Sequence, residues 1–476
     1  MPDHTLVHLG PCWQRQTFSE SPVSEVSESF DALMHETGFG RKLQVFTTRT
    51  TNTWLADLNL LSTMQSNCSF RTILFEIDTR RKQTPKVVWW LLIASSSFTC
   101  LEFFVTSRTT ISYPIFGFLT SPVGRFDDFY NNLPMPEVWY PSRAGFVLFP
   151  GSVSLYKALS AMGFSDLQAF IVFNAITYSL LFVSIFLTFR TAGVRLLILT
   201  SFPLFHSFWR ANNETLLLSL YLFALWQHQK QARSSDSASG FFVGLHAITE
   251  ANPLLFLALC PRRLDRLRTF IVSFLITTTS ITVVFFLLSG VSPTHYAESL
   301  LGLIQSDADL DFMPLHNHSL VAGISGWIRV FTGEFPVLYN SRLAIFLVTL
   351  LPIISIAILL FLTIRQVTLQ DGLICATALL LIVPTNSFTY RQVWLLVPLG
   401  LMLDKIKDSN LTNAERSQIG LIMLIIVPKT FILIKSPLNG LGHYESTLID
   451  PFLCLALLVV TVKKRISDTH ELHVVP

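Results

Sequence analysis

Charged side chains are scarce in this sequence. Asp, Glu, Lys and Arg make up 14% of its 476 residues, whereas hydrophobic residues make up 51%. Soluble globular domains average about 25% charged residues, and the mean hydropathy here is +0.51. The composition excludes a water-soluble globule and indicates an integral membrane protein.

Paired cysteines are also lacking. The six cysteines form no Cys-x-x-Cys motif, and most lie in or beside apolar segments, where cysteine behaves as a small hydrophobic residue. We therefore predict no disulfide framework and no metal site. The net charge of +3 is too small to indicate a nucleic-acid partner.

Residues 1–86 lack the apolar core of a signal peptide and any repeat. We expect them to form a cytosolic, poorly ordered tail. A small domain and a misplaced start site are the alternatives. The first span, Val87 to Val105, would then serve as an uncleaved insertion signal. Basic residues hold its start in the cytosol, namely Arg80, Arg81, Lys82 and Lys86.

Long uninterrupted apolar runs are fewer than the hydropathy suggests. Crossing a bilayer takes about 20 apolar residues, and several segments fall short. Pro253, Pro384 and Pro398 lie within or beside them, where helices break. The segments after the first span are 167–189, 194–209, 214–227, 240–249, 251–260, 269–290, 342–364, 371–385, 390–403, 417–434 and 448–462. The predicted fold is an all-α polytopic bundle of about 12 membrane segments, several of them short or broken.

Alternate crossing from a cytosolic start places the basic clusters inside, as the positive-inside rule requires. These clusters are Arg190 with Arg195, Lys230 with Arg233, Arg262 to Arg268, and Lys463 to Arg465. The threading makes 240–249 and 251–260 two short legs that meet at Glu250 to Pro253. It predicts a cell-membrane protein with both termini cytosolic, a membrane domain at 87–465 and a cytosolic tail at 466–476. The large outer loops are 106–166, with interfacial helices, and 291–341.

Two adjacent acids, Asp127 and Asp128, follow the first span among aromatic residues. Neighbouring carboxylates repel each other and burial raises a carboxyl pKa further, so one of them could act as a general base. Solvated loop acids or helix caps are the alternative. Tyr140 and Arg143 end the same loop, where a ring can stack on a sugar and Arg can grip phosphate. An interfacial anchor explains this second pair equally well.

Polar residues also gather where one apolar segment ends and the next begins. Helix capping explains Asn212 and Asn213 there, but explains His206 and Arg210 less well, because charge facing lipid is costly. Glu250 is a second costly charge. Further polar residues predicted on the outer side are Asn317, His318, Arg329, Tyr390 and Arg391. His316 and His318 lack a carboxylate at metal-ligand spacing. Clustering on one side indicates a site rather than an ion path.

Taken in order, these residues resemble the GT-C superfamily of glycosyltransferases, and most closely glycosyltransferase family 87, over residues 87–465. The matching pieces are Asp127 to Tyr130, the Tyr-Pro at 140–141, Ala211 to Glu214, Gly244-Leu245 with Glu250 to Pro253, Asn317 to Ser319 with Arg329, and Ser387 to Arg391. Two departures stand out. Glu250 occupies a position where the family usually has Lys, and His318 one where Gln is common.

The resemblance implies a metal-independent, inverting transfer of a sugar, typically mannose, from a polyprenyl-phosphate donor to a hydroxyl of a lipid or envelope glycan. The reaction would occur on the extracytoplasmic side and need no cofactor beyond the lipid-linked donor. Asp128 would be the general base, with Asp127 beside it. The donor-binding residues would be Arg143, Tyr140, His206, Arg210, Asn213, Glu250, Asn317, His318, Arg329, Tyr390 and Arg391.

Two other functions stay open from the sequence. A transporter or flippase of lipid-linked saccharides would need paired, similarly interrupted halves, and no internal repeat is evident. An envelope-polysaccharide ligase or polymerase would use outer arginines without needing Asp127 and Asp128.

Overall fold

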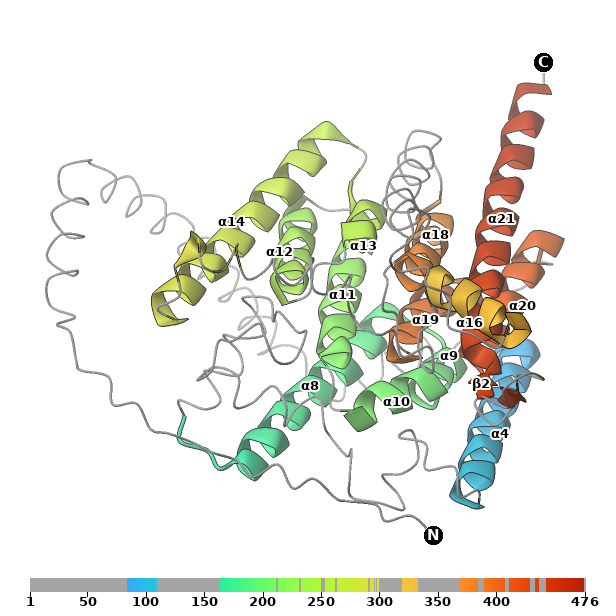
Figure 1. The fold of residues 1–476 in the computed structure, drawn as a ribbon. Coiled ribbons are helices and arrows are strands. Elements are labelled where there is room, and N and C mark those ends of the chain that lie inside the picture. Colours follow the sequence, from blue (N-terminus) through green and yellow to red (C-terminus); the bar gives the residue numbers. More distant parts are fainter. Residues whose placement is uncertain are drawn as a thin grey trace, which may run out of the picture. The chain divides into compact units, whose positions relative to one another are not determined.

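The computed structural model describes residues 84–108, 162–210, 213–230, 233–249, 253–261, 263–289, 292–294, 296, 298, 319–332, 368–383, 389–406, 411–428, 433–435 and 442–474 (Figure 1). The chain divides into two units between Arg80 and Arg81, and every described residue belongs to the second.

Helices account for nearly all of the described residues. They are α4 (Lys86–Arg108), α8 (Asp166–Thr188), α9 (Ala192–Leu199), α10 (Phe202–Arg210), α11 (Glu214–Gln229), α12 (Arg233–Thr249), α13 (Pro253–Leu259), α14 (Leu264–Ser289), α16 (Leu320–Thr332), α18 (Leu369–Ile382), the 3₁₀ helix η4 (Thr389–Leu395), α19 (Leu396–Lys405), α20 (Asn413–Ile426) and α21 (Glu445–Val474). The helical fold class is confirmed. An antiparallel pair of three-residue strands, β1 (Leu433–Lys435) and β2 (Gly442–Tyr444), was not predicted.

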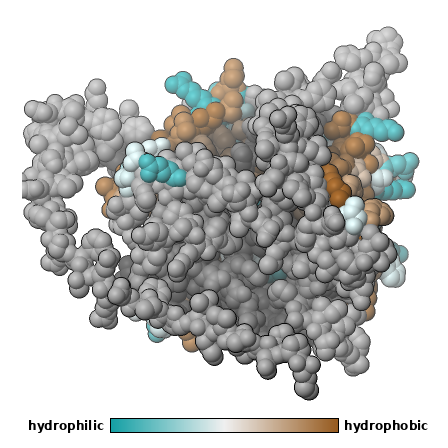
Figure 2. Space-filling view, viewed as in Figure 1, coloured by the Kyte–Doolittle hydropathy of each residue, from teal (hydrophilic) through white to brown (hydrophobic). Residues whose placement is uncertain are grey.

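Among the described helices, α8 and α14 are long and apolar enough to cross a membrane, over Leu167–Thr188 and Leu264–Leu287. Shorter apolar stretches lie at Lys86–Leu101 in α4 and Leu369–Ile382 in α18. Many large apolar side chains on α8 and α14 are exposed, as lipid contact requires, and apolar residues are prominent among the coloured residues of Figure 2. The count of about 12 membrane segments stays a prediction, and 342–364 lies outside the described residues.

Prolines begin helices in this chain. Pro253 is the first residue of α13, and Pro398 lies in the first turn of α19, where a helix needs no N–H donor. The prediction of a single segment at 194–209 was wrong. Helix α9 ends before Thr200 and α10 starts at Phe202, with Pro203 in its first turn, so this stretch forms two short helices.

The first leg of the expected hairpin is also longer than predicted. Helix α12 begins at Arg233 rather than at residue 240, and α13 covers only Pro253–Leu259. The turn between them, including Glu250, lies outside the described residues. Helix α13 packs against α18 and α11, so its neighbours come from distant parts of the sequence.

The closest helix contact joins α12 to α14. Gly240 and Gly244 lie one turn apart on α12, and an added Cβ at Gly240 would overlap the carbonyl oxygen of Phe270. A Cβ at Gly244 would lie 2.9 Å from the Cβ of Thr277. Small residues let helix backbones approach in this way inside a membrane. Near the start of both helices, Arg266 donates two hydrogen bonds to Asp236 at 2.6 and 2.7 Å.

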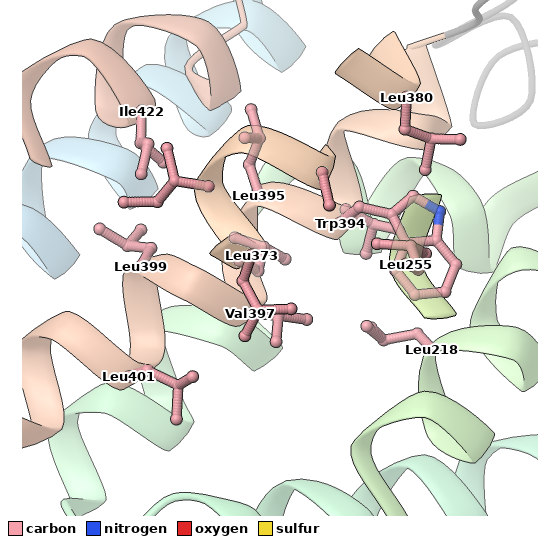
Figure 3. Packing of buried hydrophobic residues seen from close by; sticks show 14 of the residues in the cluster. Leu218, Leu255, Leu373, Leu380, Trp394, Leu395, Val397, Leu399, Leu401 and Ile422 are labelled. Carbon is pink, nitrogen blue, oxygen red and sulfur yellow. The ribbon is translucent and has the colours of Figure 1, made fainter. Parts of the chain in front are cut away.

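The apolar core surrounds α18 and the η4–α19 segment. Figure 3 shows Leu218 and Leu255 meeting Trp394, and Leu373 near Leu395 and Val397. Nearly every residue of α18 is buried, which identifies it as the central helix. Because α11, α13 and α20 all contribute to this core, the position of η4 is set by helices that come from much of the chain.

Polar contacts gather at two ends of this bundle. At one end, the Asp371 carboxylate accepts hydrogen bonds from Lys464 and Gln418, each at 3.3 Å. At the other, Asp450 accepts from Gln392 at 2.9 Å. Asp450 and Lys464 both lie on α21, about 21 Å apart along its axis at 1.5 Å per residue. The two ends are therefore separated by most of a bilayer's thickness. Which end faces the cytosol stays a prediction.

Replacing Gly240 by Ala should weaken the fold. The new methyl group would force α12 away from Phe270, at a cost of about 1–3 kcal/mol. Gly372→Ala in α18 is the matched control, because nothing lies within 4 Å of its added Cβ and Ala favours a helix by about 0.5–1 kcal/mol. The midpoint of heat inactivation in detergent should fall for Gly240→Ala and hold or rise for Gly372→Ala. Equal midpoints would contradict the close contact.

Candidate functional site

The predicted site residues divide by what the structure describes. Outside the described residues lie Asp127, Asp128, Tyr140, Arg143, Glu250, Asn317 and His318. The structure places Arg210, Arg329 and Tyr390 on α10, α16 and η4 without describing their side chains. His206, Asn213 and Arg391 are described with their side chains. The roles assigned to all of these residues stay predictions.

A buried carboxylate joins three of the described segments. Glu214 is the first residue of α11 and is 1% exposed. Its Oε2 accepts a hydrogen bond from the indole Nε1 of Trp394 at 2.7 Å, and its Oε1 lies 3.7 Å from Nε of Arg391. We call Glu214, Arg391 and Trp394 the Glu214 cluster. A buried charge is tolerated only where such partners compensate its lost hydration.

The position of Glu214 at a helix start adds a further stabilising effect. The first turn of a helix carries partial positive charge from unpaired backbone N–H groups, and this favours a carboxylate there. The indole N–H and the Arg391 guanidinium act in the same direction. Three independent features of this location therefore stabilise a negative charge among apolar helices.

Aromatic rings hold Trp394 in place. Its ring meets Tyr221 and His246 edge-on, with centroids 5.6 and 5.3 Å apart. The Tyr221 hydroxyl donates to the carbonyl of Leu255 at 3.1 Å, and the ring of Phe256 lies 5.9 Å from that of His246. Helices α11, α12 and α13 thus set the orientation of the indole, which in turn directs its N–H toward Glu214.

Helix α21 braces η4 from another direction. Gln392, next to Arg391, donates to the buried Asp450, and Trp327 on α16 donates from Nε1 to the Leu448 carbonyl at 2.9 Å. Both acceptors lie within one turn of α21. This helix therefore links η4, which carries Arg391, to α16, which carries Arg329.

His206 lies close to the same end. Its helix α10 packs against η4 and contacts α11. The His206 side chain is buried, with its ring parallel to that of Phe202 at 6.0 Å between centroids. The neighbouring Ser207 hydroxyl is 3.0 Å from that of Thr215. The structure thus brings α10, the start of α11 and η4 together, as the predicted grouping of His206, Asn213 and Arg391 requires.

The capping explanation is wrong for the Asn213 side chain. Asn213 occupies the N-cap position of α11, but its backbone is already helical and its side chain makes no capping hydrogen bond. Its carbonyl instead accepts from the Leu217 N–H at 2.9 Å, within the helix. The first turn of α11 therefore gives no reason for an amide at residue 213.

Sequence reasoning noted Glu214 beside the predicted residues but gave it no role, and it missed Trp394, Gln392 and Asp450. An available signal was an acid and an arginine in separate apolar segments on one predicted side, because intramembrane charges of opposite sign tend to pair. Within the described residues, no group of three or more His, Cys, Asp or Glu side chains could hold a metal ion. The absence of a metal stays a prediction.

The fold and this site define a helical membrane protein with charged groups buried at one end. A sequence model of glycosyltransferase family 87 matches residues 140–384, just over half of the chain. The chain belongs to this family and is a membrane glycosyltransferase, which confirms the resemblance seen in the sequence and agrees with GT-C membership. It matches no curated protein and no solved structure.

The matched stretch contains Glu214 but begins after Asp128 and ends before Arg391. Family membership therefore confirms the predicted enzyme class, in preference to a transporter, without testing either end of the proposed site. The Glu214 cluster joins a matched residue to two residues beyond the match.

Replacing Trp394 by Phe should destabilise the protein more than replacing Trp327 by Phe. Both changes keep an aromatic ring and remove an indole donor. Trp394 donates to a buried carboxylate and Trp327 to a neutral carbonyl, so we expect losses of about 1.5–3 and 0.5–1.5 kcal/mol. Heat-inactivation midpoints in detergent measure the difference. A larger fall for Trp327→Phe would show that the Trp394–Glu214 bond contributes little.

Proposed function

We propose that this enzyme transfers a sugar of the mannose type from a polyprenyl-phosphate donor to a hydroxyl of a lipid or envelope glycan on the extracytoplasmic side. The observation that carries the proposal is Arg391. It is held beside a buried acid and is 20% exposed, at the bundle end opposite the Asp371–Lys464 pair. A fixed cation at that end suits a phosphate whose lipid tail stays in the bilayer.

The chemistry is a single displacement. The acceptor hydroxyl forms a bond to the anomeric carbon while the bond from that carbon to the phosphate oxygen breaks, which inverts the configuration. Asp128 takes the hydroxyl proton, with Asp127 as its neighbour. The electron pair of the broken bond leaves with the polyprenyl phosphate, and Arg143, Arg329 and Arg391 stabilise its charge.

The other predicted residues would bind the donor. Tyr140 offers a ring face to the sugar, and hydrogen bonds would come from His206, Arg210, Asn213, Glu250, Asn317, His318 and Tyr390. Guanidinium groups supply the positive charge that a metal ion supplies in other transferases. The proposed reaction is therefore metal-independent.

The proposed location is the cell membrane, with many crossings and both termini in the cytosol. The spans available in α8 and α14 support membrane insertion. The separation of the Asp371 and Asp450 contacts along α21 supports two chemically distinct membrane faces.

Removing the proposed base should abolish most turnover. Membranes carrying Asp128→Asn should transfer labelled sugar from polyprenyl phosphate about 10²–10⁴-fold more slowly, because the acceptor proton loses its positioned base. Asp127→Asn should cost less. Each variant's amount and heat-inactivation midpoint serve as controls. Full transfer by both variants would sink the general-base assignment.

Sidedness has a separate test. Single cysteines at positions 128 and 318, in a chain whose native cysteines are replaced, should react with a membrane-impermeant maleimide from the extracytoplasmic side. Lys463→Cys is the matched control and should react only after the cytosolic side is opened, because Lys463 lies in the predicted cytosolic cluster. Labelling of 128 and 318 from the cytosol alone would overturn the topology.

A further inference from the structure

Two buried acid–arginine pairs in this chain differ in geometry although their burial is similar. In the first, Asp236 is 0% and Arg266 18% exposed, and both carboxylate oxygens accept from the guanidinium. In the second, Glu214 divides its oxygens between the Trp394 indole and Arg391. The first pair is a closed bidentate fork, whereas the second uses only one oxygen to face its arginine.

The separation in the second pair is also longer. Nε of Arg391 lies 3.7 Å from Oε1 of Glu214, within ion-pair range but beyond a hydrogen bond. A guanidinium has two hydrogen-bonding edges, one formed by Nε with one terminal nitrogen and one by the two terminal nitrogens. Glu214 faces the Nε side. The terminal edge is therefore the one that can be presented to an anion.

We propose that Glu214 is a positioning residue that orients the Arg391 guanidinium for the donor phosphate. The proposal rests on the proposed function of Arg391. Trp394 holds the carboxylate, the carboxylate holds the Nε side of Arg391, and the terminal edge then meets the phosphate in bidentate geometry. Glu214 itself does not touch the donor.

A purely structural role explains the pair less well. Buried ion pairs contribute little net stability, because desolvation offsets most of their attraction. The fold also has another anchor for η4 at the same end, the hydrogen bond from Gln392 to Asp450. A carboxylate directed at Arg391 adds something that this second anchor does not supply, namely the orientation of one charged group.

The test compares Glu214→Gln with Asp450→Asn in the full-length protein. Each change removes one buried carboxylate and keeps an oxygen that can accept from Trp394 or Gln392. Only Glu214→Gln removes the charge beside Arg391. With a polyprenyl-phosphate sugar donor, Glu214→Gln should raise the donor KM about 10-fold to 100-fold, as expected for one lost charge-assisted contact, with a smaller change in kcat. Asp450→Asn should leave the donor KM within about twofold, and Glu214→Asp should partly restore it.

A double-mutant cycle with Arg391→Gln separates positioning from stability. If Glu214 acts through Arg391, adding Glu214→Gln to Arg391→Gln should change the donor KM little further. Independent, multiplicative effects would overturn the proposal, as would equal rises in donor KM for Glu214→Gln and Asp450→Asn.

Direct binding keeps this test separate from the proposed function. A short-chain polyprenyl phosphate without a sugar should bind the solubilised wild type about 10-fold or more tightly than Glu214→Gln. Wild type that binds this lipid but transfers no sugar would refute the proposed function and leave the positioning role supported. Equal binding by wild type and Glu214→Gln, or no binding by either, would refute the positioning role.

Discussion

The hydrogen bond between the Trp394 indole and the Glu214 carboxylate is the interaction on which the functional end of this enzyme depends. A carboxylate buried among apolar helices needs partners, and this one obtains them from η4, far along the chain. The requirement fixes the register of η4 against α11. Because the Trp394 ring also packs on Tyr221 and His246, the same bond ties the polar site to the apolar core.

The opposite end and the α12–α14 contact follow a different principle. Gly240 and Gly244 allow close backbone approach, while Asp236 and Arg266 close a bidentate pair. These contacts hold helices together and satisfy their own hydrogen bonds within the pair. The Glu214 cluster instead divides one carboxylate between two residues. The chain thus contains two kinds of buried charge pair, one closed and one directed.

Much of the helical layout could be predicted from hydropathy, because apolar segments such as 167–189 and 269–290 must be helical in a bilayer. The break between α9 and α10 could not, since apolar content continues across Thr200 and Ser201 and conceals the end of a helix. Trp394 reads in the sequence as one more apolar residue, and its role depends on a donor whose acceptor lies on another helix. The part of the site around Asp127 and Asp128 still rests on the resemblance to family 87.

The distance along the chain between Glu214 and Trp394 has a consequence for biogenesis. The two residues are 180 positions apart. At a synthesis rate of about 5–20 residues per second, Glu214 emerges roughly 10–35 s before its indole partner exists. During that interval α11 enters the membrane with an acid whose final partners have not been made, so water or earlier segments must solvate it. The functional end is consequently among the last parts of the protein to be assembled.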